Sequence, residues 1–509
     1  MGTPAPESTF GCRRFVCPPE AITSLRTITS RLDILGAMTA VSTIPARHRS
    51  RRRRWPAALR FGWADLLGPA AIASVVAVIC LWLMNGGIDE AIAGDRGIGS
   101  YGLLTGLLAS DLMLLQVFLL ARIPWVERAW GHDVLTRRHR WIGFASFWFM
   151  VTHVAVFAVE RLSRDEGAPL ARLWAVFVTD PWMLWATAGT VMIIGVVVTS
   201  IRWARRRLRY ESWHLLHLYA YLGIGLALPH QLADGADFHD TWSQIYWWTL
   251  YITATSSVLV FRIGLPLWRS WFHRLRVETV EEETADVVSV TITGHRLDRL
   301  RTRSGQFFIW RFRSGHGWTR GNPYTLSAAP QRDRLRISIQ SVGDGSARAA
   351  ALSPGTRVLI EGPYGALTAG KWYRPRILMI AAGVGVTPMR ALLEDTPFNA
   401  GDATLVYRYS DRNTAILLDE LELLSARRGI QLIELAGPRR TPSSWLPRDP
   451  RWGTEDAVSD GDWFRAAVPD LAQCDVFICG PSRWTASVRR ALLAAGAHGS
   501  AIHTEEFGW

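Results

Sequence analysis

The sequence predicts a six-helix transmembrane bundle that is followed by a small antiparallel β-barrel and an α/β domain. Six long apolar runs fill the first half of the chain, short turn-separated strands follow from residue 274, and strands alternate with helices from residue 374. A chain of 509 residues is long enough for two or three domains. Its residues are 49% hydrophobic and its mean hydropathy is +0.09, which indicates that one part is embedded in a membrane and another is soluble.

The apolar runs have the length of membrane-spanning helices, for which about 20 residues are needed. They cover roughly 63–85, 98–122, 138–160, 181–201, 212–232 and 243–266. The connections near 123–137 and 202–209 are rich in arginine, whereas those near 86–97 and 231–240 are acidic. Because arginine-rich connections stay on the cytoplasmic side, we expect a multi-pass protein of the plasma membrane with both termini in the cytoplasm.

The same arginines account for the charge of the chain. The net charge is +13, but much of the arginine lies beside the apolar runs or in the polar N-terminal segment. The positive-inside rule produces this distribution, so we expect the lipid bilayer, and no nucleic acid, as a partner. Four parts are predicted: a basic disordered cytoplasmic tail (1–58), the membrane bundle (59–271), the barrel (272–370) and the α/β domain (371–509).

Two of the apolar runs carry widely spaced histidines. In the third run His139 and His153 are 14 residues apart, a spacing that returns to within about 40° of the same helix face. In the fifth run His217 and His230 are 13 residues apart, which leaves them well off one face of a straight helix. Ionisable side chains inside a membrane are costly, so their default interpretation is functional.

The predicted topology sets these histidines in two pairs. The third and fifth runs cross the membrane in the same direction. His139 and His217 are therefore expected at the same depth near the cytoplasm, and His153 and His230 at the same depth near the outside. His214 is a rival for His217, one turn earlier. Two facing imidazoles are typical of haem ligation. No Cys-x-x-Cys-His motif is present, so we expect two non-covalent b-type haems. Histidines that are structural, or part of a proton path, are the alternative.

Two segments of the predicted barrel carry polar and glycine residues suited to binding a cofactor. The first contains Asn322, Pro323, Tyr324, Thr325, Leu326 and Ser327. In the second, Gly343 and Gly345 precede a predicted helix at Ser346. A glycine turn that leads into a helix N-terminus exposes backbone N–H groups, which suit a pyrophosphate.

The α/β domain places similar groups after three predicted strands. They are Gly383, Gly385, Thr387 and Pro388 after the first strand, Arg408 and Arg412 at the second, and Cys479, Gly480 and Pro481 at the third. Ligands of such sheets bind beyond the carboxyl ends of the strands. Arginine suits a 2′-phosphate, although both arginines are equally compatible with solvated surface positions.

In combination these motifs resemble the ferric reductase and NADPH oxidase family, over about residues 60 to 509. Residues 322–327 are similar to that family's His-Pro-Phe-Thr flavin motif, and residues 362–365 match the end of its flavin domain. The C-terminal residues 505–509 resemble its acidic-aromatic ending, in which a terminal aromatic residue covers the flavin; Trp509 is the candidate and Phe507 its rival. The resemblance implies FAD, NADPH or NADH, and two haem b groups, with Cys479 near the nicotinamide.

The chain also departs from that family at two motifs. Asn322 and Tyr324 replace the usual histidine and phenylalanine of the flavin motif, and Phe157 stands where animal superoxide-producing members have a further histidine. The reduction of oxygen is therefore not the only expected reaction, and ferric chelates or a redox partner protein are equally compatible acceptors.

The sequence thus predicts a transmembrane oxidoreductase. It would pass electrons from cytoplasmic NAD(P)H through FAD and two haems to a small acceptor outside the membrane. A flavoreductase tethered by a haem-free bundle, which serves a partner protein, is the main alternative. A haem-binding sensor with an inactive reductase module is a further one.

Overall fold

The membrane half consists of long helices. The structure, a computed structural model, describes residues 63–509 apart from 93–96, 165–168, 209, 235–239, 442–443, 449–458 and 507–509. The long helices are α2 (Trp63–Met84), α4 (Gly97–Leu120), α6 (His132–Arg164), α8 (Pro181–Ser200), α10 (Tyr210–Asp234) and α11 (Thr241–Ser257). The predicted tail 1–58 lies outside the described residues.

Short helices connect or extend the long ones. They are α3 (Gly87–Ile92), α5 (Pro124–Trp130), α7 (Pro169–Thr179) and α9 (Arg202–Arg207). After α11 the chain continues through a π-helical stretch, η3 (Val258–Gly264), into α12 (Leu265–His273). The connection 161–180 is therefore more regular than the sequence indicates, because α7 forms within it.

Five helices of the described chain are long and apolar enough to cross a membrane. They cover Leu66–Met84, Ile98–Leu120, Val134–Ser163, Pro181–Ser200 and Thr241–His273. The remaining expected span, α10, forms a continuous helix through Pro229 but is not among these five. These helices make the chain a multi-pass membrane protein, and the count of six spans stays a prediction.

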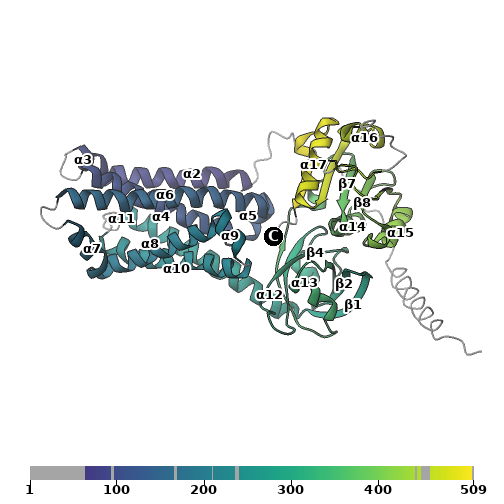
Figure 1. Cartoon of the computed structure of the whole chain (residues 1–509), viewed down its shortest axis with the longest axis horizontal. Helices are drawn as coiled ribbons and strands as arrows, with labels where there is room; N and C mark the ends of the chain where they lie inside the picture. The colour runs from purple at the N-terminus through teal and green to yellow at the C-terminus, as the bar shows by residue number, and fades with distance from the viewer. Residues whose placement is uncertain are drawn as a thin grey trace, which may run out of the picture. The chain divides into compact units, whose positions relative to one another are not determined.

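Glycines allow two pairs of helices to pack closely. Helix α6 lies against α4, and α10 lies against α8 (Figure 1). A Cβ added to Gly106 of α4 would lie 2.5 Å from Nδ1 of His153, and one added to Gly189 of α8 would lie 2.6 Å from the carbonyl oxygen of Gly223 on α10. Small residues permit such close approach in membranes. Backbone contact between α6 and α10 themselves is sparse by comparison.

The middle of the chain forms two three-stranded antiparallel sheets. One has the order β1 (Arg276–Thr284), β2 (Val287–Thr293), β5 (Arg334–Gln340), and the other β4 (Asn322–Thr325), β3 (Phe307–Phe312), β6 (Val358–Tyr364). Isolated bridges between Arg276 and Arg357, and between Leu326 and Ile337, link residues at the ends of the two sheets. Apolar residues from both sheets share one core. The antiparallel strands agree with the prediction, whereas strand β4 was not anticipated.

The C-terminal part is a five-stranded parallel sheet. Its order is β11 (Ile502–Glu506), β10 (Cys474–Gly480), β7 (Arg376–Ala382), β8 (Ala403–Tyr409), β9 (Gln431–Ala436). One core cluster includes residues of α14 (Val386–Asp395) and α15 (Leu418–Arg428), and another includes residues of α16 (Asp460–Ala467) and α17 (Ser482–Ala494). The helices therefore cover both faces of the sheet, as its buried apolar strands require.

Candidate functional site

The inner pair of predicted histidines is brought together by α6 and α10. The ring centroids of His139 and His217 are 5.9 Å apart. A metal bonded at about 2 Å to one nitrogen of each ring would set the two centroids roughly 6 Å apart. The observed spacing therefore suits a metal held between the two imidazoles.

The outer pair has the same arrangement. The ring centroids of His153 and His230 are 6.5 Å apart. Both pairs lie between α6 and α10, the two helices with sparse mutual backbone contact. The structure thus brings together the two residues of each predicted pair, and their binding of a haem stays a prediction. The predicted rival, His214, faces instead a charged neighbourhood that includes Arg122, Arg262 and Glu361.

Hydrogen bonds orient one ring of each pair. Nδ1 of His153 lies 2.9 Å from the carbonyl oxygen of Gly102. A carbonyl only accepts, so in a neutral imidazole Nδ1 donates and the lone pair is on Nε2. Metal-binding histidines usually donate their second nitrogen in this way.

The ring of His217 is oriented by Ser200. The Ser200 hydroxyl donates to the carbonyl oxygen of Val196 at 2.7 Å, so its oxygen can only accept from its other neighbours. These are Nε1 of Trp213 at 3.2 Å and Nδ1 of His217 at 3.2 Å. His217 therefore donates through Nδ1 and keeps its lone pair on Nε2, as His153 does.

The predicted flavin motif forms strand β4 and the turn that follows it. Trp310 of β3 donates from Nε1 to the carbonyl oxygen of Tyr324 at 2.9 Å, which fixes the strand. Burial raises the pKa of Tyr324 to about 12, so its phenol stays neutral. The buried hydroxyl of Thr325 has no hydrogen-bond partner within the described residues, and such an orphan is expected where a ligand supplies the missing partner.

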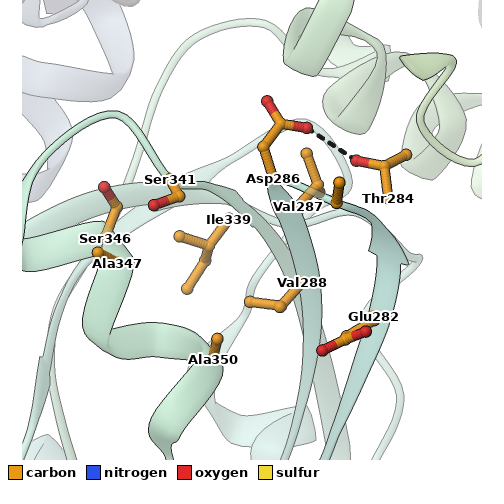
Figure 2. Close-up of a pocket in the computed structure, with 11 residues that line it drawn as sticks. Glu282, Thr284, Asp286, Val287, Val288, Ile339, Ser341, Ser346, Ala347 and Ala350 are labelled. Carbon is orange, nitrogen blue, oxygen red and sulfur yellow. Dashed lines mark hydrogen bonds between the residues drawn. The ribbon is translucent and has the colours of Figure 1, made fainter. Parts of the chain in front are cut away.

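The predicted pyrophosphate turn forms a very short helix, α13 (Asp344–Ala347). The Ser346 hydroxyl accepts from the backbone N–H groups of Val342 and Gly343 at 2.9 and 3.1 Å. Beside it lies a hollow of about 120 Å³ that Glu282, Thr284, Asp286, Ile339 and Ser346 help to line (Figure 2).

That hollow does not suit a phosphate, because it contains two carboxylates. Hydrogen bonds from Gln340 and Thr284 lower the pKa of Asp286, which is therefore ionised at neutral pH (Figure 2). Like charges repel, so an anionic ligand would avoid this side of α13. The role predicted for Gly343, Gly345 and Ser346 stays a prediction.

The parallel sheet brings two of the predicted nicotinamide segments to one point. Strands β8 and β9 lie on one side of β7, and β10 and β11 lie on the other, so the direction in which strands are added reverses between β7 and β10. Gly383 and Gly385 follow β7, and Gly480 and Pro481 end or follow β10. Such reversal points form the ligand-binding crevice of open α/β sheets.

Glycine is required at this crevice for contact between the two segments. A Cβ on Gly385 would lie 2.3 Å from the carbonyl oxygen of Cys479. The Cys479 side chain is fully buried, and burial raises the pKa of its thiol well above the usual range. A protonated thiol suits a residue that packs against a ligand rather than a nucleophile. Thr387 donates to the carbonyl oxygen of Val384 at 2.9 Å, and Pro388 lies in the first turn of α14.

The two predicted phosphate-binding arginines already have partners. Arg408 is buried and donates to the carbonyl oxygens of Leu435 and Gly437 at 3.1 and 2.5 Å, and burial lowers its pKa to about 10. Arg412 is exposed and pairs with Glu422 and with Glu434. Both arginines thus already bind other groups, and their contact with a 2′-phosphate stays a prediction.

The C-terminal strand β11 runs beside β10, with Glu505 opposite Cys479. A Cβ on Gly365, the residue after strand β6, would lie 2.8 Å from Oε1 of Glu505. The chain end thus approaches both cofactor domains. The predicted aromatic cover, Trp509, and its rival Phe507 lie outside the described residues.

A buried ion network that the sequence did not indicate links the flavin segment to the α/β domain. Both guanidinium Nη atoms of Arg336 bind the carboxylate of Glu420, at 2.6 and 2.9 Å, and Nε of Arg390 lies 2.8 Å from the same carboxylate. Arg336 also donates to the Ser327 hydroxyl at 3.2 Å. No local sequence signal predicts it, because its members come from β5, α14 and α15.

We expect Glu420→Gln to destabilise the reductase half by about 3 kcal/mol at pH 7, since Arg336 loses its paired carboxylate and Arg390 keeps only Glu394. Burial alone would raise the pKa of Glu420, but the bonds from Arg336 and Arg390 lower it overall. Because the pKa of Glu420 is lower in the folded state, its carboxylate stabilises the folded protein at pH values above the unfolded-state pKa of about 4.3. This stabilisation is lost as the pH falls through the folded-state pKa. Thermal melts should therefore show a deficit at pH 7 that shrinks below about pH 4.

Glu422→Gln on the same helix is the matched control for this prediction. Glu422 pairs with Arg412, and both side chains are exposed. Exposed pairs contribute between about 0 and 1 kcal/mol, so its melt should be close to that of the unaltered protein. Equal melts for the two variants would contradict the role of Glu420.

The fold and the site define a class of protein: a membrane helix bundle with two facing histidine pairs, joined to a module of two antiparallel sheets and a parallel sheet. Residues 105–228 match the family model "Ferric reductase like transmembrane component". The chain therefore combines a ferric-reductase-like transmembrane component with a ferredoxin-reductase-type FAD/NAD module. The matched residues include His139, His153 and His217, and His230 lies just beyond them.

Several curated proteins and solved structures are similar to parts of the chain. The ferredoxin reductase component of 3-ketosteroid-9-alpha-monooxygenase from Mycolicibacterium smegmatis is 30% identical over 243 residues, 46% of this chain and 65% of that protein. Human dual oxidase 2 is 24% identical over 330 residues, 59% of this chain and 20% of that protein. The flavohem-like FAD/NAD binding domain of nitric oxide dioxygenase from Vibrio cholerae is 22% identical, with a TM-score of 0.37, over 47% of this chain and 99% of that one.

The chain spans 64–66% of the length of the first three curated relatives that it matches. These relatives are reductase components or subunits of monooxygenases.

Proposed function

We propose that the protein passes electrons from cytoplasmic NAD(P)H through FAD and two b-type haems to an acceptor outside the membrane. The observation that carries this proposal is the pair of imidazole couples, with centroids 5.9 and 6.5 Å apart, between two membrane helices. When bound, nicotinamide and flavin would supply hydride transfer, and the haems single-electron transfer across the bilayer. The family match and the reductase relatives support the same direction of electron flow.

The residues of the chain bind and orient these groups. His139 with His217, and His153 with His230, would each hold one haem through a nitrogen on either side of it. Gly102 and Ser200 keep the ligating nitrogens of His153 and His217 unprotonated. Hydride and electrons would move between the cofactors, and the proton left when the reduced flavin is reoxidised would pass to solvent, so no residue of the chain is needed as a general acid or base.

The reductase half would bind the other two cofactors. The orphan hydroxyl of Thr325 and the neighbouring residues of strand β4 would contact FAD. The crevice between Gly385 and Gly480 would take the nicotinamide, with Cys479 forming its floor. In this proposal six helices span the plasma membrane, α10 included, both termini are cytoplasmic, and the two antiparallel sheets close as one barrel.

The acceptor would react near the outer histidine pair. Phe157 packs on His153 there, with ring centroids 5.0 Å apart. An aromatic hydrocarbon next to the outer couple offers no hydrogen bond to a reduced-oxygen species, so ferric chelates or a redox partner protein are favoured over oxygen.

Purified membranes test this function directly. We expect a dithionite-reduced spectrum of a low-spin b-type cytochrome, about two haems per chain by extraction, and reduction of both by NADPH without added protein. A haem-free protein that still oxidises NADPH would reject the proposal. It would favour a tethered flavoreductase that serves a partner, the arrangement suggested by the ferredoxin reductase relatives.

Removal of the Ser200 hydroxyl should change the inner haem without removing its ligand. In Ser200→Ala, Nδ1 of His217 loses its acceptor, so the imidazole becomes a weaker electron donor and the oxidised metal is less stabilised. We expect one of two midpoint potentials to rise and haem retention to fall by roughly tenfold or more. Potentiometric titration of the spectrum measures both.

Thr199→Ala is the matched control. The Thr199 hydroxyl bonds only the backbone carbonyls of Gly195 and Val196 on its own helix. Its potentials should equal those of the unaltered protein. An identical shift in both variants would show that Ser200 acts on the helix and not on His217.

A further inference from the structure

The turn after α4 holds a buried arginine in an unusual conformation. Arg122 has φ +64, in the left-handed region that residues with a Cβ seldom adopt, and only 7% of it is exposed. A guanidinium is costly to bury unless it is paired. The partners of Arg122 should therefore explain why the chain keeps it there.

Arg122 contacts charged and aromatic groups from two different parts of the chain. On the membrane side, its Nη1 donates to Oε1 of Glu127 at 2.9 Å and lies 3.3 Å from Nδ1 of His132. On the barrel side, its Nε lies 3.8 Å from Oε1 of Glu361, and its guanidinium lies 4.6 Å from the ring centre of Tyr364. One side chain thus joins the α4–α5 turn to strand β6.

The ionisation of this cluster is consistent with a permanent contact. Burial alone would raise the pKa of Glu127, but the bond to His132 and the charge of Arg122 lower it overall. Burial, and next the charge of Glu361, raise the pKa of Tyr364, whose ring stays neutral beneath the guanidinium. Arg311 of the barrel lies 3.4 Å from the other oxygen of Glu361 and completes the charge balance.

Each side of the contact leads to a cofactor site. On the membrane side, the carbonyl oxygen of Leu120, two residues before Arg122, accepts from Arg262 at 2.8 Å. A turn earlier on α4, the side chain of Gln116 packs against Gly143 of α6, one turn beyond His139.

On the barrel side, strands β6 and β3 lie between Arg122 and the flavin motif. Tyr364 of β6 lies opposite Phe307 of β3, and Phe307 lies opposite Thr325 of the flavin motif. Arg122 is therefore connected through packed elements to the inner histidine pair in one direction and to the flavin motif in the other.

A second tie to the same strand comes from α12. The Ser270 hydroxyl accepts from the backbone N–H of Ile360 at 3.0 Å, and Arg269 donates to the carbonyl oxygen of Gly362. Helix α12 continues from the last membrane helix, whereas Arg122 follows α4. Two different membrane helices therefore hold strand β6.

We propose that Arg122 is a positioning residue that holds the flavin domain in register with the inner histidine pair. This inference rests on the proposed function. Hydride transfer to the flavin would deliver two electrons and one hydrogen nucleus. The electrons would leave one at a time towards the membrane, and the proton would be released to the cytoplasmic solvent. Arg122 acts on that second stage only, because it contacts neither the nicotinamide crevice nor the flavin motif.

The test uses full-length protein in nanodiscs, and it compares Arg122→Gln with Arg334→Gln. We expect Arg122→Gln to leave NADPH-driven flavin reduction unchanged and to slow haem reduction by the flavin by roughly tenfold or more in anaerobic stopped-flow traces. Arg334 makes an exposed ion pair with Glu278 on the barrel surface, so its variant should retain both rates.

A second readout does not depend on haem. Hydrogen exchange should quicken in Arg122→Gln at residues 119–132 and, in parallel, at residues 358–366, because the two segments separate. Glu361→Gln should reproduce both effects from the barrel side, and it serves as the test if Arg122→Gln fails to accumulate.

The possible failures are distinguishable. If the unaltered protein binds no haem that NADPH reduces, the proposed function is wrong. If it does, but Arg122→Gln and Glu361→Gln keep the haem-reduction rate and the exchange pattern, the positioning role is wrong. Equal slowing of flavin reduction would show general damage to the reductase and would also overturn the inference.

Discussion

His217→Ala is expected to remove one of two haems, whereas His214→Ala leaves both. The ring of His217 lies 5.9 Å from that of His139, while His214, one turn earlier on α10, faces a charged neighbourhood at Glu361 and Arg122. Loss of one axial imidazole removes half of the ligation of the inner site. Haem content should fall from about two to about one per chain, and NADPH-driven reduction of an external acceptor should cease.

Pyridine haemochrome content and acceptor reduction in vesicles measure this effect. NADPH oxidation with a soluble acceptor should persist in both variants, since the reductase half does not contain the altered residue. Two haems in His217→Ala, or one haem in His214→Ala, would reverse the assignment of the inner ligand.

Gly385→Ala should have the second largest effect, and it acts on the other end of the electron path. The added Cβ would lie 2.3 Å from the carbonyl oxygen of Cys479 and 2.6 Å from its carbonyl carbon. Both atoms belong to the backbone of β10, which is hydrogen-bonded between β11 and β7, so neither can move aside. We expect destabilisation of about 2–3 kcal/mol.

The turn must also move away from β10, which widens the crevice in which the nicotinamide is proposed to bind. A displacement of about 1 Å can cost 10²-fold in rate, so NADPH oxidation should fall by that order while the content of FAD and haem is retained. Gly499→Ala is the control, because its nearest contact would be an ordinary 3.8 Å to Leu493. Normal NADPH oxidation in Gly385→Ala would place the nicotinamide elsewhere.

Local patterns predicted most of the elements, and they singled out four histidines whose rings lie close together in two pairs. Apolar runs, strand alternation and glycine turns report on a few neighbouring residues at a time, which is why the long helices, the antiparallel strands and the turn at Gly383–Gly385 agree with the structure. The pairing of His139 with His217 could be predicted because arginine-rich connections set the direction of each span.

The pairing of His153 with His230 could not be predicted from helix geometry alone. An ideal helix turns His230 away from the face of His217, yet the ring of His230 lies 6.5 Å from that of His153. Arg408 is a second example, since the sequence was equally compatible with phosphate binding and with a solvated surface position, and the structure buries this arginine against backbone carbonyls. Both outcomes depend on neighbours that are distant in the sequence.

The sequence by itself determined the division into a membrane bundle and a reductase module, the residues of the histidine pairs and the positions of the glycine turns. Only the tertiary structure decided that the paired rings of α6 and α10 lie close together, that Gly385 packs against β10, and that Arg122 meets Glu361. The physical reason is that hydrophobic periodicity and turn chemistry act between near neighbours along the chain. Contacts such as Arg122 with Glu361 exist only once whole helices and sheets have packed.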